Sequence, residues 1–339
     1  MSFLYPTRLI GLCSSLTMGF GHAELKRDKG LFICREHDVQ LVVPEKSLAR
    51  GSVQIQLPGP CEQFPQWTPQ DYADAQGLID KVVRVWKSQG ITDYMIYGKD
   101  AISTIDPFCW EVVPYPKTEW RICRIWKQIK VLWNLTFGGI STPLAERKKI
   151  VTTIQNESEQ SPQSQDGQIL AQTAARVESV QKVVHHTDPF CTLQVIQKQC
   201  VFESKEIYVL YNYAPIALGK DKLHFLLVPK AHRETFKDVT GAEYMKIMQL
   251  TQELIKHYNK QGLHTAYIFD KSGAEAGQTV PHWHEHLVFT ATPTQEFLGR
   301  LKVLKNMIFG SSPLPARELK DRVTHLKQTL PEILSSSYE

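Results

Sequence analysis

The sequence has no C-x-x-C pair and no long apolar run. Its seven cysteines are an odd number, spread from residue 13 to residue 200. A disulfide framework uses an even number of cysteines, so this pattern is typical of a reduced chain, and we expect a cytoplasmic location. No apolar stretch reaches the roughly 18 residues that a membrane-spanning helix requires, and we expect no membrane partner.

The chain also has little net charge. The formal charge is +4 over 339 residues, and the 42% hydrophobic and 22% charged residues are typical of a globular protein. So small an excess argues against a dedicated nucleic-acid-binding protein and suits a small anionic substrate. Residues 1–23 resemble a secretion signal only in part, because they carry one arginine and a short, interrupted apolar stretch. Export is therefore the alternative to a cytoplasmic location.

What the sequence does contain is a cluster of histidines. The stretch GQTVPHWHEHLVF begins at Gly277 and places His282, His284 and His286 two residues apart. Side chains alternate along a β-strand, so this spacing puts the three imidazoles on one face. Three histidines are a common zinc-binding set, and imidazole also suits catalysis. From these residues alone a metal site, a catalytic site and a coincidence are all open.

The chain contains an internal duplication. Thr68 aligns with Thr240 and Gly90 with Gly262 without a gap. Each copy predicts a threonine-capped helix of about 18 residues, a glycine that ends it and a short strand. The order strand, strand, helix, strand, strand, helix predicts an α+β fold with antiparallel sheets. The predicted boundaries are residues 1–155 for the first unit, 156–197 for a linker and 198–339 for the second unit with its C-terminal helix.

The alignment sets apolar residues against the histidines. DPFCWEVVPY overlays VPHWHEHLVF after a two-residue deletion, so the first unit has Phe108, Trp110 and Val112 at the three positions. The strand can then be built without histidine, and we expect the first unit to be inert. Both units keep a glutamate, Glu111 and Glu285, which we assign to the opposite face and to a structural role.

Upstream of these helices, each unit has an apolar tripeptide that ends at a proline. LVV precedes Pro44 and LLV precedes Pro229, and we align these two predicted strands. Residues 51–63, GSVQIQLPGPCEQ, are left without a counterpart by this alignment. We expect them to be a surface loop inserted in the first unit.

In its context the histidine cluster resembles a known signature. AGQTVPHWHEHLVF, with HFLLVPKAH about 60 residues upstream, is similar to the motif of the histidine triad (HIT) family. The resemblance covers the second unit, and the first unit is HIT-like only through its match to the second. It implies two tandem HIT-like units, each an antiparallel sheet with helices, that pair within one chain as a pseudo-dimer and leave the protein a monomer. Two such units also resemble the branch of galactose-1-phosphate uridylyltransferase and dinucleoside tetraphosphate phosphorylase.

The resemblance implies a mechanism in which an imidazole attacks the α-phosphorus of a nucleotide and forms a nucleotidyl-histidine. It makes His284 the nucleophile and His286 the group that contacts the phosphate and protonates the leaving group. It makes His282 the residue that orients its neighbour, and it adds His224 to the cluster.

The resemblance also implies substrate-binding residues. The expected contacts are phosphoryl oxygens for Gln278 and Thr279, ribose hydroxyls for Asn212, and the base for Tyr211 and Ile216. Lys271 stands where the family has Asn or Gln aimed at the phosphate. A lysine there either binds further phosphates or points to solvent.

We therefore expect a hydrolase of nucleotide phosphoesters or phosphoramidates that needs no cofactor and no metal, with a nucleotide as partner and no nucleic acid. The alternatives are a nucleotidyltransferase or phosphorylase, and a zinc-dependent or non-catalytic nucleotide-binding module. The transferase branch typically has Gln at the third triad position, so His286 favours the hydrolase. His232 is assigned a structural role, and the tetrapeptide DPFC, which occurs at 106–109 and 188–191, is assigned none.

Overall fold

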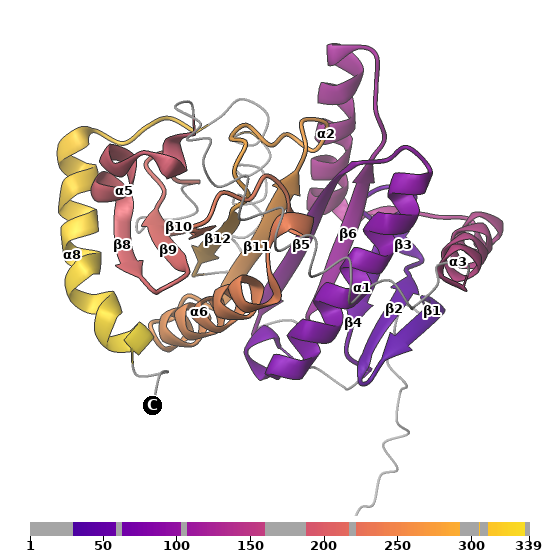
Figure 1. Ribbon diagram of the computed structural model, residues 1–339, viewed down its shortest axis with the longest axis horizontal. Coiled ribbons are helices and arrows are strands. Elements are labelled where there is room, and N and C mark those ends of the chain that lie inside the picture. Colours follow the sequence, from indigo (N-terminus) through magenta and orange to yellow (C-terminus); the bar gives the residue numbers. More distant parts are fainter. Residues whose placement is uncertain are drawn as a thin grey trace, which may run out of the picture.

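The computed structural model of the protein describes residues 30–58, 63–102, 107–159, 188–216, 222–291, 305 and 311–335. In these residues a single ten-stranded sheet runs through the molecule in the order β1-β2-β4-β6-β5-β11-β12-β10-β9-β8 (Figure 1). All its strand pairs are antiparallel, which confirms the predicted α+β class. The first 27 residues and most of the predicted linker lie outside the described residues.

Each unit contributes five strands to the sheet. The first unit supplies β1 (Leu31–Glu36), β2 (Val39–Val43), β4 (Val53–Gln56), β5 (Asp93–Ala101) and β6 (Cys109–Tyr115), and a separate small ladder pairs β3 (Lys46–Ser47) with β7 (Ile140–Ser141). The second unit supplies β8 (Cys200–Glu203), β9 (Ile207–Tyr211), β10 (His224–Pro229), β11 (Thr265–Ser272) and β12 (Glu285–Thr290).

The longer helices are α1 (Pro69–Ser88), α2 (Arg121–Phe137), α3 (Leu144–Glu159), α5 (Leu193–Gln199), α6 (Gly241–Lys260) and α8 (Ala316–Ser335). Short 3-10 turns are η1 (Phe64–Gln66), η2 (Pro189–Cys191) and η3 (Phe236–Asp238). Helix α8 is the predicted C-terminal helix, and it buries an apolar stripe of Val323, Leu326 and Leu330. None of the helices in the described residues is long and apolar enough to cross a membrane.

Helices α1 and α6 begin in the same way. Thr68 and Asp71 form a capping box at α1, and Thr240 and Glu243 form the equivalent box at α6. These reciprocal bonds satisfy backbone N–H groups that the first helical turn leaves without partners, as the sequence predicts. Both helices cover the same face of the sheet and contact each other across the joint between the units, where Gln252 Nε2 donates to the carbonyl oxygen of Trp67 at 2.8 Å.

The two units join through β5 and β11, and the register of this joint is symmetric. Tyr97 lies opposite Phe269, with Ile96 opposite Asp270 and Gly98 opposite Ile268. The gapless alignment makes Tyr97 and Phe269 counterparts, so each strand pairs with its own equivalent. A pseudo-twofold axis therefore passes between these two residues, as in an isologous dimer made within one chain.

Strand β4 corrects the prediction of an inserted loop. It lies beside β6 just as β10 lies beside β12, so β4 is the counterpart of β10, and β2 is the counterpart of β9. The sequence alignment had matched β2 with β10 because both are short apolar runs that end at a proline. Val53 and Ile55 are buried on the helix-covered face, and an alternating strand of this kind is easily mistaken for a loop when prolines follow it.

The strand register also corrects which residues of the first unit are equivalent to the histidines of the second. Tyr97 pairs with Glu111, whereas its counterpart Phe269 pairs with His286. The structural counterpart of His286 is therefore Glu111, one residue before the position that the alignment gave. A shift of one residue moves a side chain to the other face of a sheet.

The packing agrees with this corrected register. Phe108 packs on Phe64 of η1 with ring centroids 4.9 Å apart, as Trp283 packs on Phe236 of η3 at 5.9 Å. Phe108 and Trp110 thus belong to the helix-covered core and do not occupy the triad positions. The two aligned glutamates lie on opposite faces as well. Glu285 accepts from Thr251 of α6, while Glu111 accepts from the backbone N–H of Leu48.

Candidate functional site

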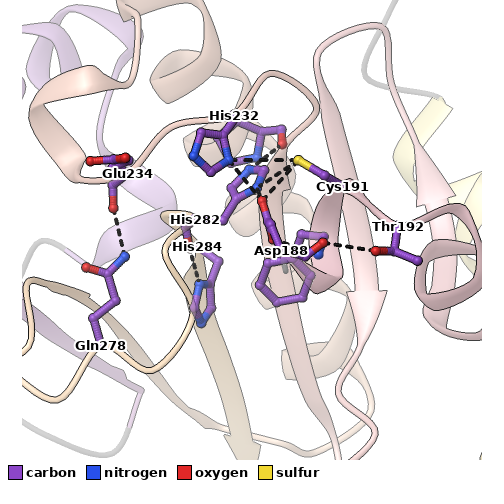
Figure 2. A network of polar contacts seen from close by, with 10 residues as sticks. Asp188, Cys191, Thr192, His232, Glu234, Gln278, His282 and His284 are labelled. Atoms are coloured by element: carbon purple, nitrogen blue, oxygen red, sulfur yellow. Dashed lines mark hydrogen bonds and ion pairs between the residues drawn. The ribbon is translucent and has the colours of Figure 1, made fainter. Parts of the chain in front are cut away.

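The histidines gather on the sheet face that α6 does not cover. His224 begins β10 and His286 lies in β12, while His282 and His284 occupy the segment just before β12. The rings of His284 and His286 are 4.7 Å apart, and Phe269 of β11 stacks flat on His286 at 4.5 Å. Three of the four histidines therefore form one cluster. His282 turns away from it, contrary to the expectation that all triad side chains share one face (Figure 2).

His284 is held in a single tautomer. Its Nδ1 lies 2.8 Å from the carbonyl oxygen of His282, and since a carbonyl can only accept, Nδ1 carries the proton. Burial lowers the pKa of His284 to about 4, and the positive charge of Lys271 acts in the same direction. The ring is therefore neutral near pH 7 with its lone pair on Nε2, the form in which an imidazole is a nucleophile. His282 orients its neighbour through its backbone, not through its ring.

His224 and His286 are joined by a hydrogen bond, and both take the tautomer opposite to that of His284, with the proton on Nε2. The backbone N–H of Ile216 donates to His224 Nδ1 at 3.1 Å, so the His224 proton sits on Nε2. That Nε2 lies 2.9 Å from Nδ1 of His286 and donates to it, which leaves the His286 proton on its own Nε2. Burial lowers the pKa of His224 to about 3 and holds that of His286 well below its usual range, so both rings are neutral. His286 therefore presents an N–H donor beside the His284 lone pair.

Lys271 points toward this cluster. It is half-buried on β11, and its positive charge lowers the pKa of both His284 and His286. A Cβ atom built on Gly277 would lie 3.5 Å from Lys271 Nζ, so the ammonium also lies against the loop before the triad. Burial lowers the pKa of Lys271 to about 8. Of the two orientations considered from the sequence, the one toward solvent does not fit these contacts.

The loop at residues 273–278 uses the side chain of Gln278 to close on itself. Gln278 Oε1 accepts from the backbone N–H of Gly273 at 2.7 Å, and Gln278 Nε2 donates to the carbonyl oxygen of Glu234 at 2.7 Å (Figure 2). Both ends of the amide are engaged, so its role here is to shape the loop. Thr279 is exposed beside it.

The first unit braces this loop from the other side of the joint. Gln128 of α2 donates to the carbonyl oxygen of Glu275 at 2.9 Å, and Thr118 donates to the Glu275 carboxylate at 2.6 Å. Asp93 accepts from the backbone N–H of Glu275 at 2.7 Å. Gly273, with a φ of 92°, sits so close to the Asp93 carboxylate that any side chain would collide with it. Nothing in the sequence of the first unit indicated these contacts.

Asn212 is buried beside His224, with Nδ2 3.2 Å from His224 Nδ1 and Oδ1 accepting from the backbone N–H of Ala214. Its expected contact with a ribose stays a prediction. Ile216 packs with Phe269 on the open face of the sheet. Tyr211 lies on the opposite, helix-covered face in the main core, so it does not line a base pocket with Ile216.

A second polar cluster surrounds the ring of His282. The Asp188 carboxylate lies 2.7 Å from His282 Nδ1, 2.9 Å from His232 Nδ1 and 3.0 Å from Cys191 Sγ. Cys191 Sγ is 3.8 Å from each of the two imidazole nitrogens (Figure 2). All four ligand atoms lie within 4.8 Å of one another. The sequence held a signal for this cluster in the tetrapeptide DPFC at 188–191, which we had assigned to chance.

The donor set of this cluster fits a zinc ion. Two imidazoles, a thiol and a carboxylate are zinc ligands, and tetrahedral bonds of about 2.0–2.3 Å place ligand atoms roughly 3.3–3.8 Å apart. The two distances from Cys191 Sγ to imidazole nitrogens, 3.8 Å each, match this spacing, whereas the three Asp188 contacts are hydrogen-bond distances that would lengthen around an ion. His282 Nε2 lies 3.0 Å from the carbonyl oxygen of Pro229. Both nitrogens of the His282 ring thus face an acceptor, and two states of the ring satisfy them: an imidazolium that donates to Pro229 and Asp188, or a cation at Nδ1 that leaves the Nε2 proton for Pro229. Partial burial and the Asp188 carboxylate raise the pKa of the Cys191 thiol to about 12, a shift that a bound cation would reverse.

The matching face of the first unit carries no imidazole in the described residues. By the corrected register Cys109 is the counterpart of His284, Glu111 of His286 and Ser52 of His224. Met95 and Val113 pack on this face under α2. The first unit therefore lacks counterparts of the His284 and His286 imidazoles. The residues that stand at these positions are not the ones that the sequence alignment gave.

Comparison with known proteins finds a domain match over most of the second unit. Residues 194–292 match the model of the HIT domain. Over 99 residues the chain is 34% identical to a Bis(5'-adenosyl)-triphosphatase of Saccharomyces cerevisiae, a match that covers 28% of this chain and 45% of that protein. The chain thus spans about half the length of the curated relatives that it matches.

Among solved structures, a galt-like protein of Arabidopsis thaliana is similar over 88% of each chain with a TM-score of 0.48 and 12% identity. An ADP-Glucose Phosphorylase of the same plant is similar over 87% of this chain and 85% of its own, with a TM-score of 0.46 and 10% identity. The domain match and the histidine geometry agree with the resemblance seen in the sequence. The second half of the chain thus contains a HIT domain, at residues 194–292.

Proposed function

We propose that the protein is a nucleotide hydrolase that acts through a nucleotidyl intermediate on His284. The observation that carries this proposal is the pair of opposite tautomers in adjacent rings. His284 presents a lone pair at Nε2, because its Nδ1 proton is bound to a backbone oxygen. His286 presents a proton at Nε2, because its Nδ1 accepts from His224. Group transfer from a phosphate ester needs this combination of a nucleophile and an acid.

In the first step the His284 Nε2 lone pair forms a bond to the α-phosphorus of the nucleotide. The bond from phosphorus to the bridging oxygen or nitrogen breaks, and the leaving group takes that electron pair while the Nε2–H of His286 donates a hydrogen bond to it and Lys271 offsets its charge. A leaving nitrogen takes its proton from solvent. In the second step water adds to the phosphorus and releases one proton to solvent, while the bond to His284 breaks and the ring takes its electron pair back. The products are a nucleoside monophosphate and the leaving group, and the enzyme returns to its starting state.

Lys271 and the loop at 273–278 suit a leaving group that carries phosphates. The Lys271 ammonium lies beside Gly277 and near both catalytic rings, where negative charge on a phosphate chain would stabilise it. Backbone N–H groups of the loop, including those of Gln278 and Thr279, are then the donors to the phosphoryl oxygens. The Saccharomyces cerevisiae relative is named as a Bis(5'-adenosyl)-triphosphatase, which is consistent with a dinucleoside polyphosphate substrate here.

The test is turnover of a panel of dinucleoside polyphosphates and nucleoside phosphoramidates in 18O-labelled water, with and without inorganic phosphate. We expect a nucleoside monophosphate that carries one labelled oxygen whether or not phosphate is added. A nucleoside diphosphate formed only with added phosphate would instead establish the phosphorylase alternative. Tight binding of nucleotide without any turnover would establish the binding module.

The oligomeric state and the unit boundaries belong to the same proposal. We propose that the intrachain pairing of β5 with β11 takes the place of a second chain, so the protein is a monomer in solution. The first unit spans residues 1–155 and the second 198–339. In the structure the end of the predicted linker packs on the second unit, with Phe190 and Ile196 against Leu226.

We further propose that Asp188, Cys191, His232 and His282 hold one zinc ion, which departs from the sequence-based expectation of no metal. The ion would clamp the segment of η2 onto the strand that carries the catalytic rings, and would supply structure alone. Elemental analysis of protein purified without added zinc should give about one equivalent, and Cys191→Ser should reduce it sharply. His257→Ala, a histidine change on α6, serves as control. Active, folded protein with well under one equivalent would contradict the proposal.

A further inference from the structure

Helix α2 exposes an unusual set of large apolar side chains. Of the ten large hydrophobic residues that are exposed in the described chain, five lie between positions 120 and 133. Four of the seven tryptophans are buried, whereas Trp120, Trp126 and Trp133 are 70%, 65% and 55% exposed. Ile122 and Ile125 are exposed between them. These positions recur at intervals of three, four and seven residues, which puts Ile122, Trp126 and Trp133 on one face of a helix.

The same helix concentrates the positive charge of the molecule. Between residues 117 and 130 there are five basic residues and one acidic residue, a net charge of +4, which equals the formal net charge of the whole chain. Arg121 and Lys130 are exposed, and Arg124 and Lys127 are half-buried. The remainder of the chain is therefore neutral overall, and α2 is its one strongly basic element among the described helices.

The opposite side of α2 is firmly attached to the protein. Val131 and Leu135 pack with Met95 and Val113 on the sheet, and Asn134 donates to the carbonyl oxygen of Leu48 at 2.7 Å. Figure 1 shows the helix rising from this attachment beyond the edge of the sheet. The apolar and basic surface is thus presented on a firmly attached helix that the other described residues leave exposed.

From these features we infer that α2 is a docking surface for an anionic lipid bilayer, on which the protein sits peripherally. Tryptophan and isoleucine side chains on one face enter the region between headgroups and acyl chains, and lysine and arginine beside them bind the anionic headgroups. A single-stranded nucleic acid would need a groove long enough to track its backbone, whereas the hollow on this face is lined by residues of α2 alone and the face is rich in isoleucine. The inference departs from the sequence-based expectation of no membrane partner, and it does not depend on the proposed enzymatic activity.

The test is binding of the full chain to large vesicles of phosphatidylcholine with about 30 mol % phosphatidylglycerol, against phosphatidylcholine alone. We expect co-sedimentation with the anionic vesicles, a blue shift of tryptophan emission, and release in about 0.5 M salt, where screening is nearly complete at a few ångströms. The double variants Ile122→Gln with Trp126→Gln, and Lys127→Gln with Lys130→Gln, whose charges lie beside Trp126 and Trp133, should each bind roughly tenfold or more weakly. Turnover of a water-soluble nucleotide should be unchanged in both.

Matched controls remove comparable side chains elsewhere. Phe32→Gln removes an exposed aromatic ring from β1, and Lys148→Gln with Lys149→Gln removes two exposed charges from α3. Both controls should bind vesicles as the unaltered chain does. Equal binding to neutral vesicles, tighter binding to a single-stranded oligonucleotide, or a dimer in light scattering that the Ile122→Gln, Trp126→Gln variant abolishes would each overturn the inference. Thermal unfolding of every variant checks that the fold is intact.

Discussion

The two units of this chain use one scaffold for different purposes. Their strands follow the same order from the joint outward, and their first long helices begin with the same capping box. On the open face of the sheet, however, the second unit places His284 and His286 where the first has Cys109 and Glu111. The fold fixes where side chains can meet, and the residues at those places decide whether chemistry follows.

The first unit is nevertheless part of the site. Its Asp93, Thr118 and Gln128 hold the loop that lies beside the catalytic rings, and α2 carries both that brace and the exposed tryptophans. The unit without the triad histidines thus contacts the loop beside the histidine cluster of its neighbour. We therefore expect a division of labour in which the second unit supplies the reacting groups and the first unit supports the loop beside them. Substitutions at equivalent positions of the two units test this expectation.

The largest expected contrast is between the two positions at the centre of the open face. His284→Ala removes the nucleophile and should lower kcat by three or more orders of magnitude, because removal of a covalent nucleophile usually has an effect of that size. Cys109→Ala changes the counterpart in the first unit and should leave kcat within a factor of about two. Steady-state kinetics on both variants measures the contrast.

Trapping the intermediate sharpens the same comparison. Acid-quenched protein that has reacted with labelled nucleotide should carry the label on His284, located by mass spectrometry of peptides. A label on any other residue, or near-normal turnover by His284→Ala, would show that the opposite tautomers of the two rings have another use.

The second contrast concerns the helix-covered core. Trp110 is 2% exposed and packs on Phe64 and Phe108 in the first unit. Trp110→Ala should lower the free energy of unfolding by about 3–5 kcal/mol, since it empties a close-packed aromatic site. The nucleotide chemistry should persist at temperatures where the variant is folded, and light scattering should find a monomer before and after the change. A stable homodimer, or two nucleotides bound per chain, would contradict the division of labour.

Much of this fold could be predicted from the sequence, because its signals are local. Capping boxes at Thr68 and Thr240 and the apolar stripe of α8 depend on residues within a few turns of each other. The alignment failed where it crossed a loop. Two alignments whose deletions differ by one residue match the two sequences about equally well. The choice between them nevertheless moves Phe108 and Trp110 to the other face of the sheet.

The candidate site was predictable in part for the same reason. His284, His286 and the upstream His224 follow from a compact motif. The cluster of Asp188, Cys191, His232 and His282 joins segments far apart in the chain, and only the fold brings them together. Gln128 lies in the other unit altogether, and no motif in its neighbourhood points to the loop that it braces.

The third contrast lies in buried carboxyl groups. Burial raises the pKa of Asp270 and of Glu285 to about 8, and in the first unit Gly98 and Trp110 stand at these two positions. A carboxyl with a raised folded pKa stays protonated after the unfolded chain has lost its proton. The stability that it contributes is therefore lost as pH rises through about 8. Glu111, with a pKa of about 7, acts in the same direction.

The histidines of the cluster change the free energy of unfolding with pH in the opposite direction to the carboxyls. Folded pKa values of about 3 for His224 and about 4 for His284 mean that their contribution is present above the unfolded value of 6.5 and is lost as pH falls below it. Between about pH 4.5 and 6.5 these two effects oppose each other, whereas between about pH 6.5 and 8 the carboxyls dominate and the free energy of unfolding should fall by about 3 kcal/mol. Denaturant titrations of the Asp270→Asn, Glu285→Gln variant should give a flatter curve over that range. An unchanged slope would refute the assignment.

The smallest expected effect tests whether the first unit positions the loop. Gln128→Ala removes one of three braces on Glu275, while those from Asp93 and Thr118 remain. One hydrogen bond contributes about 1 kcal/mol, so kcat/KM should fall about fivefold. The loss should appear mainly in KM for substrates with a longer phosphate chain, because the loop and Lys271 contact that part. Gln155→Ala is the matched control, since its amide also donates to a carbonyl oxygen, that of Ile33, far from the loop. If both variants change the kinetics equally, the effect belongs to general stability and the first unit does not position the site.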